Sequence, residues 1–150
     1  MASSCPLMLG QVDTAILSFS KAFDMVSHKK FLHKLDHYGV RGALHIWLTT
    51  FLTQRSMKVV TLESESSDEV PVESGVPQGT VLGLILFLYH VNDLPSCVTS
   101  QVQLFASDCL VSREINQFHD HITFQNDLKQ LEAWAQKWGM ECKEMPHSEH

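Results

Sequence analysis

Residues 104–111, which read LFASDCLV, place a single carboxylate, Asp108, at the corner of an otherwise apolar hairpin. Two short apolar runs that meet at a polar turn are typical of a β-hairpin. Asp is common in such turns because it tolerates their backbone angles, so Asp108 can be interpreted simply as a turn residue. The alternative is that Asp108, preceded by Ser107, is the remnant of a pair of carboxylates.

Two further segments have residue types that could carry chemistry. In residues 17–24, LSFSKAFD, a buried strand runs into a turn, which is where open sheets present functional groups. In residues 74–80, SGVPQGT, two glycines and a proline precede a helix, whose free N–H groups and the Gln78 amide could hold an anion. Taken alone, the first segment is favoured as a strand followed by an ordinary polar turn, and the second is no better than any Gly/Pro loop.

Two pairs of residues at helical spacing are weaker candidates. His33 and His37 stand four residues apart and could grip a metal, but no adjacent Glu completes a zinc-protease pattern, so a solvated pair is favoured. Trp134 and Trp138 have the same spacing. They are expected in the core or at its edge rather than as a platform for stacking bases.

The elements that must position these groups are predicted from hydrophobic periodicity and end signals. They are a strand over 13–19, helices over 27–38 and 42–54, a hairpin of 56–63 with 69–73, a buried helix over 80–90, a hairpin over 101–113 and an amphipathic helix over 118–138. The core-facing residues expected on the first two helices and the last are Phe31, Leu32, Leu35, Leu44, Trp47, Leu48, Phe51, Leu52, Ile122, Leu128, Leu131, Trp134 and Trp138. The pattern predicts one α+β domain, followed by a frayed polar tail over 141–150.

Composition narrows the class of protein. The 150 residues carry a formal net charge of −6, which argues against a free-standing nucleic-acid binder. The first 60 residues nevertheless hold seven of the 11 Lys and Arg, concentrated in residues 27–34, where a solvated helix face is favoured over a phosphate-contacting patch. Residues 1–10 do not read as a signal peptide. Four scattered cysteines favour a reducing compartment.

Taken together, four segments resemble the palm domain of a reverse transcriptase of the non-LTR retrotransposon type (LINE, jockey-like). They read SFSKAFDMVSHKKFLHKLDHYGVRG, SGVPQGTVLG, VNDLP and LFASD, in this order, and the resemblance covers residues 10–140. It implies a polymerase-type palm with a small, mostly antiparallel sheet backed by helices, and with fingers and thumb largely missing. It also implies RNA-templated DNA synthesis with two Mg²⁺ ions, acting on an RNA template, a DNA primer and deoxynucleotide triphosphates. The implied location is intracellular, in the cytoplasm or nucleus, with no membrane partner.

The sequence departs from this family at the positions that hold metal. Where the family reads LDFSKAFD and FADD, this chain has Ser18 and Ser107, so Asp108 is the one remaining metal ligand of three. Two Mg²⁺ ions about 3.5–4 Å apart require anionic oxygen ligands, and a serine hydroxyl is neutral. We therefore expect two-metal binding to fail and polymerase activity to fall by several orders of magnitude.

Other positions match the family, and the resemblance implies roles for them. Lys21 and Ala22 fall where backbone N–H groups meet the incoming triphosphate, and Phe23 falls where an aromatic gate excludes a ribose 2′-hydroxyl. Gln78 and Gly79 match the loop that packs against that nucleotide. The family also continues past residue 140 as a strand with a lysine, a motif that is expected to be missing here.

The sequence therefore predicts a reverse transcriptase domain fragment that is catalytically inactive. Two alternatives stay open: a non-catalytic RNA- or protein-binding module, and a decayed retroelement-derived reading frame. In the second case, palm helices without their fingers and thumb contacts would leave apolar surface exposed and favour aggregation.

Overall fold

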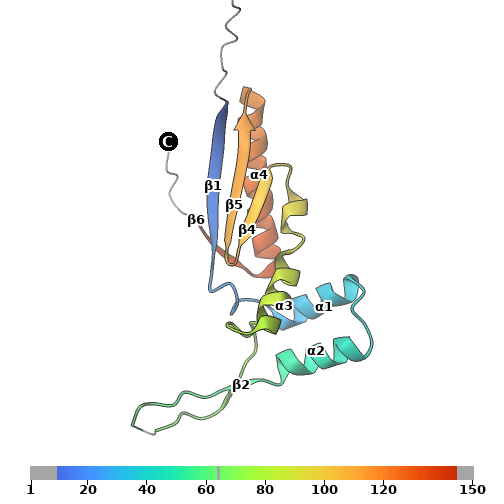
Figure 1. Cartoon of the computed structure of the whole chain (residues 1–150), viewed down its shortest axis with the longest axis vertical. Coiled ribbons are helices and arrows are strands. Elements are labelled where there is room, and N and C mark those ends of the chain that lie inside the picture. Colours follow the sequence, from blue (N-terminus) through green and yellow to red (C-terminus); the bar gives the residue numbers. More distant parts are fainter. Residues whose placement is uncertain (1–9, 64, 145–150) are drawn as a thin grey trace, which may run out of the picture.

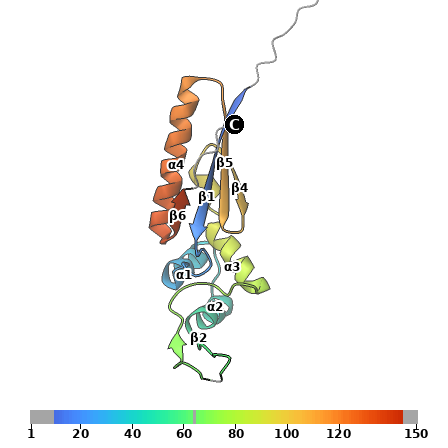
Figure 2. The same cartoon turned by 90° about the vertical axis from the view of Figure 1, so that its left-hand side faces the viewer.

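The computed structural model describes residues 10–63 and 65–144, and its main feature is a four-stranded antiparallel sheet with the order β4–β5–β1–β6. The strands are β1 (Gln11–Ser20), β4 (Gln101–Phe105), β5 (Asp108–Ile115) and β6 (Glu141–Glu144). Helix α4 (Phe118–Trp138) runs along one face of the sheet, and no described element covers the other, the open face (Figure 2). This arrangement confirms the predicted palm-type sheet backed by helices.

Three helices lie below the sheet in the view of Figure 1. They are α1 (His28–His37), α2 (Ala43–Thr53) and α3 (Val81–Val91), and a short 3₁₀ helix, η1 (Leu94–Cys97), follows α3. Strands β2 (Ser56–Met57) and β3 (Val70–Pro71) pair at the base of a projecting arm (Figure 1), and this pairing is shorter than the predicted hairpin. No helix in the described ranges has the length and apolar character needed to cross a bilayer.

Helix boundaries follow the end signals in the sequence. The Ser27 hydroxyl caps α1 by accepting from the Lys30 N–H at 3.5 Å, and the Thr80 hydroxyl caps α3 by accepting from the Gly83 N–H at 3.0 Å. Side-chain oxygens at these positions satisfy N–H groups that a helix leaves without intrahelical partners. The predicted helices therefore begin and end within one or two residues of the observed ones.

Alternation along the strands assigns each residue to one face of the sheet. Ala15 and Phe19 on β1, with Cys109 and Val111 on β5, are buried on the face that α4 covers. The Phe19 ring lies 6.1 Å from the Trp134 ring of α4. The residues that alternate with these, Ser18 and Asp108 included, therefore face the open side.

The prediction of a frayed tail after residue 140 is wrong for residues 141–144, which form β6. Gly139 ends α4 in the left-handed conformation, with φ of 72°, and Met140 is buried directly after it. The chain then returns along β1, whose edge offers unpaired backbone groups to a further strand. The rest of the predicted tail, residues 145–150, and residues 1–9 of the segment tested for a signal peptide lie outside the described residues.

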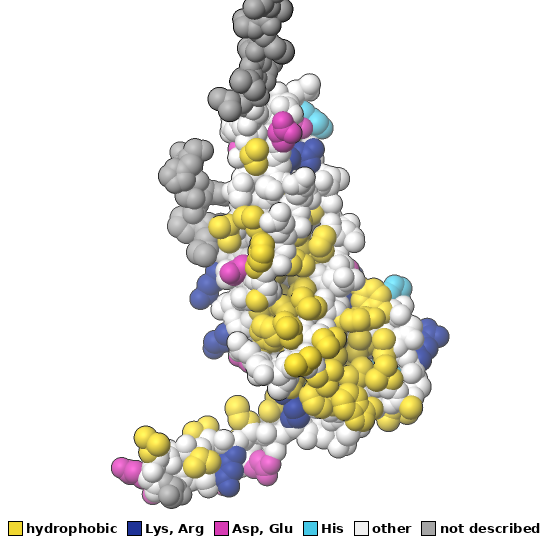
Figure 3. All heavy atoms as spheres, viewed as in Figure 1, with side chains coloured by type: hydrophobic (Ala, Val, Ile, Leu, Met, Phe, Trp, Pro, Cys, Tyr) yellow, Lys and Arg dark blue, Asp and Glu magenta, His cyan; other side chains and the backbone are white. Residues whose placement is uncertain are grey.

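The predicted core is also corrected in part. Phe31, Leu35, Leu48, Leu52, Leu131 and Trp134 are buried as predicted. Ile122, Leu44 and Trp47 are instead exposed, and α3 buries one face only. Periodicity reports which residues are apolar but not whether another element covers them. Apolar side chains consequently gather on the surface of the helices below the sheet (Figure 3); those exposed on α2 and α3 are Leu44, Ile46, Trp47, Val81, Leu84, Ile85, Leu88 and Tyr89.

A buried lysine connects α1 to the end of α3 and to α4. The Lys34 side chain is 3% exposed, and its Nζ donates to the His90 carbonyl at 2.6 Å and to Asp93 Oδ1 at 2.7 Å. Nζ also lies 3.9 Å from the centre of the Trp138 ring. Trp134 Nε1 donates to the same Asp93 oxygen at 3.1 Å. Burial lowers the pKa of Lys34, and the hydrogen bond that it donates to Asp93 opposes that shift.

Replacing Asp93 by Asn tests this connection. The change leaves a buried ammonium without its counter-charge, so we expect the free energy of unfolding to fall by about 3 kcal/mol, measured by urea denaturation. Asp36→Asn is the matched control, because its 3.2 Å pair with Arg41 is exposed on both sides. The control should change stability by less than about 0.5 kcal/mol. Equal effects of the two variants would contradict a structural role for the Lys34–Asp93 pair.

His90 is the second buried titratable group of this region. Its side chain is fully buried between aromatic rings, and neither ring nitrogen has a hydrogen-bond partner among the described residues. Burial, together with the nearby Lys34 charge, lowers the pKa of His90 to about 3. The neutral ring is therefore the folded form at any pH near neutrality.

This depressed pKa predicts a loss of stability in mild acid. The unfolded chain binds the His90 proton near pH 6.5 and the folded chain does so only near pH 3, so stability is full above pH 6.5 and falls as the pH drops below it. At pH 5.5 the loss from this residue is about 1.4 kcal/mol. Urea denaturation at pH 7.5 and pH 5.5 measures it against His90→Leu, which should lose that much less. Parallel losses in the two proteins would rule out His90 as the source.

Candidate active site

The sheet brings together the three positions singled out at the strand end and the hairpin corner. Ser18 of β1 lies directly opposite Asp108 of β5 in the antiparallel register. One residue further, the Phe19 N–H donates to the Ser107 carbonyl at 2.9 Å. Ser18, Ser107 and Asp108 therefore occupy one end of the sheet, with Ser18 and Asp108 on the open face. The chemical roles inferred for them from sequence stay predictions.

The backbone at this site is strained. Phe105 pairs with Asp108, so Ala106 and Ser107 form a two-residue hairpin loop. Ala106 has φ of 50° and Lys21, directly after β1, has φ of 48°; among the described residues these are the two non-glycines with positive φ. Such angles cost non-glycine residues free energy and cluster at functional sites. The strain therefore lies at the two corners that bracket Ser18 and Asp108.

The loop over residues 74–80 packs onto the turn that follows β1. The Val76 N–H donates to the Phe23 carbonyl and the Gly75 N–H to the Val26 carbonyl, each at 2.8 Å. The Ser74 hydroxyl donates to the Asp24 carbonyl at the same distance. Gly75 has φ of 89°, and a Cβ there would lie 2.9 Å from Asp24 Cα, so glycine is required. Two segments about 50 residues apart thus form one wall.

The five positions expected to meet a nucleotide lie on this wall. Lys21 is exposed, whereas Ala22 is buried below it. The Phe23 ring stacks on Phe87 of α3, with centroids 4.3 Å apart. Gln78 and Gly79 are exposed just before the N-terminus of α3. The structure gives their placement, and their contact with a nucleotide stays a prediction.

Strand β6 adds a residue that the sequence interpretation missed. Lys143 lies opposite Ser18 on the side away from β5, so Ser18 stands between Asp108 and Lys143 in one cross-strand row. Paired residues of antiparallel strands point to the same face. The expectation that the late strand and its lysine are missing is therefore wrong. The signal was available, because Gly139 marks the end of α4 and a lysine follows within four residues.

The donor set at this corner does not suit a pair of Mg²⁺ ions. Ser18, Ser107 and Asp108 supply one carboxylate and two neutral hydroxyls, and Lys143 supplies a positive charge beside them. Mg²⁺ binds through hard anionic oxygens in near-octahedral geometry. Within residues 10–63 and 65–144, no cluster of three His, Cys, Asp or Glu side chains could hold a metal ion.

Comparisons with known proteins agree on one family. The family model for reverse transcriptase (RNA-dependent DNA polymerase) matches residues 14–145. The chain is 27% identical over 135 residues to the RNA-directed DNA polymerase from mobile element jockey of Drosophila melanogaster, covering 84% of this chain. It is also 27% identical over 140 residues, or 85% of the chain, to the probable RNA-directed DNA polymerase from transposon X-element of the same fly. In each case the match spans 14% of the relative's length.

Ala106→Gly tests the strain at the hairpin corner. A positive φ at the first of two loop residues is typical of a turn that prefers glycine there, so we expect the free energy of unfolding to rise by about 0.5–1 kcal/mol. Ala133→Gly, on the exposed side of α4, is the matched control and should lower it by about 1 kcal/mol. Thermal and urea denaturation measure both. A loss of stability in Ala106→Gly would show that the corner is unstrained.

Proposed function

The chain belongs to the reverse transcriptase family, and we propose that it is a copy of this domain that has lost the ability to catalyse nucleotidyl transfer. It spans 14% of the length of the two polymerases it matches, so RNA-templated DNA synthesis is carried over from the family as a proposal. The observation that carries the proposal is the corner at which Ser18 faces Asp108.

The argument for inactivity is electrostatic. Three carboxylates at this corner would place three formal negative charges opposite up to four positive charges of two Mg²⁺ ions. Ser18, Ser107 and Asp108 place one there, and Lys143 lies in the same row. The family implies use of a divalent metal, but these residues do not fit two ions. Asp108 is the one residue of the three that would serve as an anionic ligand.

The rest of the nucleotide-binding wall supports descent from an active domain. The loop that holds Gln78 and Gly79 remains tied to the turn that holds Lys21, Ala22 and Phe23 by backbone hydrogen bonds. We infer that these five residues form the nucleotide-facing surface. The proposed ligands are an RNA template, a DNA primer and deoxynucleotide triphosphates, met inside the cell.

Primer extension on an RNA template tests the proposal. With Mg²⁺, and then with Mn²⁺, the unmodified chain should add nucleotides several orders of magnitude more slowly than an intact relative. The double variant Ser18→Asp with Ser107→Asp restores the missing carboxylates, and recovery of extension would assign the loss to them. Extension by the unmodified chain at the rate of an intact relative would overturn the proposal.

A matched control separates a local carboxylate effect from a change in net charge. Ser112→Asp adds a carboxylate on the same open face of β5, opposite Thr14 and four residues from the corner. It should leave primer extension unchanged. If it rescued extension as well as the double variant does, the placement of the carboxylates at Ser18 and Ser107 would not matter, and the metal-site argument would fail.

A second candidate is a non-catalytic protein-binding module, and the apolar surface of α2 and α3 favours it. Ile46 is 68% exposed and Val81 is 79% exposed, and six further apolar residues of these helices are exposed around them. Contiguous apolar surface of this kind is typical of interaction sites and of aggregation-prone fragments. Light scattering across a range of concentrations distinguishes these outcomes, since a defined complex has a fixed stoichiometry and aggregation does not.

A further inference from the structure

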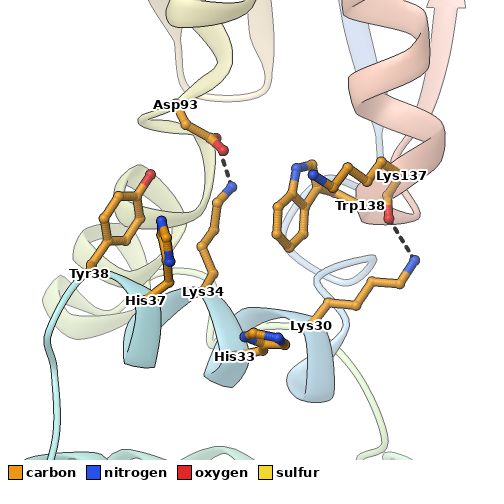
Figure 4. Close-up of a pocket in the computed structure, with 8 residues that line it drawn as sticks. All are labelled: Lys30, His33, Lys34, His37, Tyr38, Asp93, Lys137 and Trp138. Atoms are coloured by element: carbon orange, nitrogen blue, oxygen red, sulfur yellow. Dashed lines mark hydrogen bonds and ion pairs between the residues drawn. The ribbon is translucent and has the colours of Figure 1, made fainter.

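A pocket of about 500 Å³ lies between α1, η1 and the C-terminal end of α4 (Figure 4). One face of α1 lines it with Lys30, His33, Lys34 and His37, at the i, i+3, i+4 and i+7 spacing that places side chains on a single stripe. Lys30 and Lys34 are cationic, and His33 and His37 carry ring N–H donors. The stripe includes the basic stretch and the histidine pair of the sequence, which the proposed active site leaves unused.

The charges around the pocket do not cancel. Lys34 is paired with Asp93 at 2.7 Å, and Asp93 is the one acidic residue of the lining. Lys30 donates to the Lys137 carbonyl at 2.8 Å, which fixes its position but leaves its charge without a carboxylate. Lys137 adds another ammonium from α4. In a chain of net charge −6, this local excess of positive charge singles out an anion as the ligand.

Three of the side chains are available to a ligand. His33, His37 and Lys137 are exposed, and none of them donates a hydrogen bond to another described residue. Lys34 is buried and Lys30 connects two helices, so packing explains those two lysines. Packing does not explain the other three. All three line the same pocket, so they offer donors to a phosphate group that enters it.

Aromatic side chains form the remaining walls. Tyr38 ends the stripe on α1, and Trp138 faces it from α4, with the Lys137 ammonium 5.2 Å from the Trp138 ring centre. Indole and phenol rings provide apolar surface against which a base can lie. A volume of this size falls in the range of small-molecule sites and exceeds what inorganic phosphate alone would fill.

We propose that this pocket binds a nucleotide, either free or as part of a single RNA strand, through phosphate contacts from His33, His37 and Lys137. The pocket is bounded by helices, whereas Ser18 and Asp108 lie on the open face of the sheet. The site is therefore separate from the proposed active site, and the inference does not depend on whether the corner at Asp108 is catalytically inactive.

Binding measurements on the whole chain test this. Fluorescence anisotropy with a labelled oligouridylate reports on an RNA strand, and calorimetry with uridine triphosphate and with sodium phosphate reports on the free nucleotide and on the anion alone. We expect the oligouridylate or the triphosphate to bind at low salt, and inorganic phosphate to bind more weakly than either. Lys137→Gln should weaken binding by about tenfold. For the RNA strand it should also reduce the slope of log K against log salt by about 0.7.

Matched variants decide the outcome. The double variant His33→Gln with His37→Gln should weaken binding as Lys137→Gln does. Lys129→Gln should leave binding unchanged, because Lys129 is exposed on α4, as Lys137 is, but lies outside the pocket. All these side chains are exposed, so thermal denaturation should show that the variants fold alike. Absence of binding at low salt, equal weakening by Lys129→Gln, or phosphate binding as tightly as the triphosphate would each overturn the proposal.

Discussion

The buried ammonium of Lys34 is the interaction on which the lower half of the molecule depends. A charge in that position is costly unless it is paired and hydrogen-bonded, and here a carboxylate, a carbonyl and an indole ring surround it. Lys34 stands on α1, and its partners come from α3 (the His90 carbonyl), from the segment after α3 (Asp93) and from α4 (Trp138). One side chain thereby fixes three elements far apart in the sequence. It also sets the distance between α1 and α4, and so shapes the pocket that they enclose.

The proposed active site depends on backbone geometry more than on side-chain packing. Ser18 and Asp108 meet because two antiparallel strands pair in that register, and the loop over 74–80 is held by N–H and carbonyl groups. The pairing of β1 with β5 does not depend on whether Ser or Asp stands at positions 18 and 107. The backbone framework of a reverse transcriptase domain can therefore persist whether Ser or Asp stands at these positions.

Sequence predicted the parts of the fold that local signals specify. Ser27 and Thr80 predict helix starts because their hydroxyls can cap a helix, and the apolar runs around Asp108 predict a hairpin. Strand β6 was missed because its pairing depends on the free edge of β1, about 120 residues away in the chain. The burial of Lys34 was missed for a similar reason. Its partner Asp93 lies 59 residues away in the chain. Nothing in the charge pattern of α1 distinguishes Lys34 from its exposed neighbours Lys30 and His33.

The alternation of β1 and β5 has a consequence for the history of this gene. Ser18 faces the open side of the sheet, so exchanging a carboxylate for serine there removes charge repulsion and disturbs no packing. Gly75, by contrast, has no substitute that fits its backbone. Once selection for DNA synthesis is relaxed, substitutions can accumulate at the catalytic carboxylates. Substitutions in the loop beside them are still selected against, because they would disturb folding. A domain can in this way lose its catalytic carboxylates first, while its fold is still recognisable.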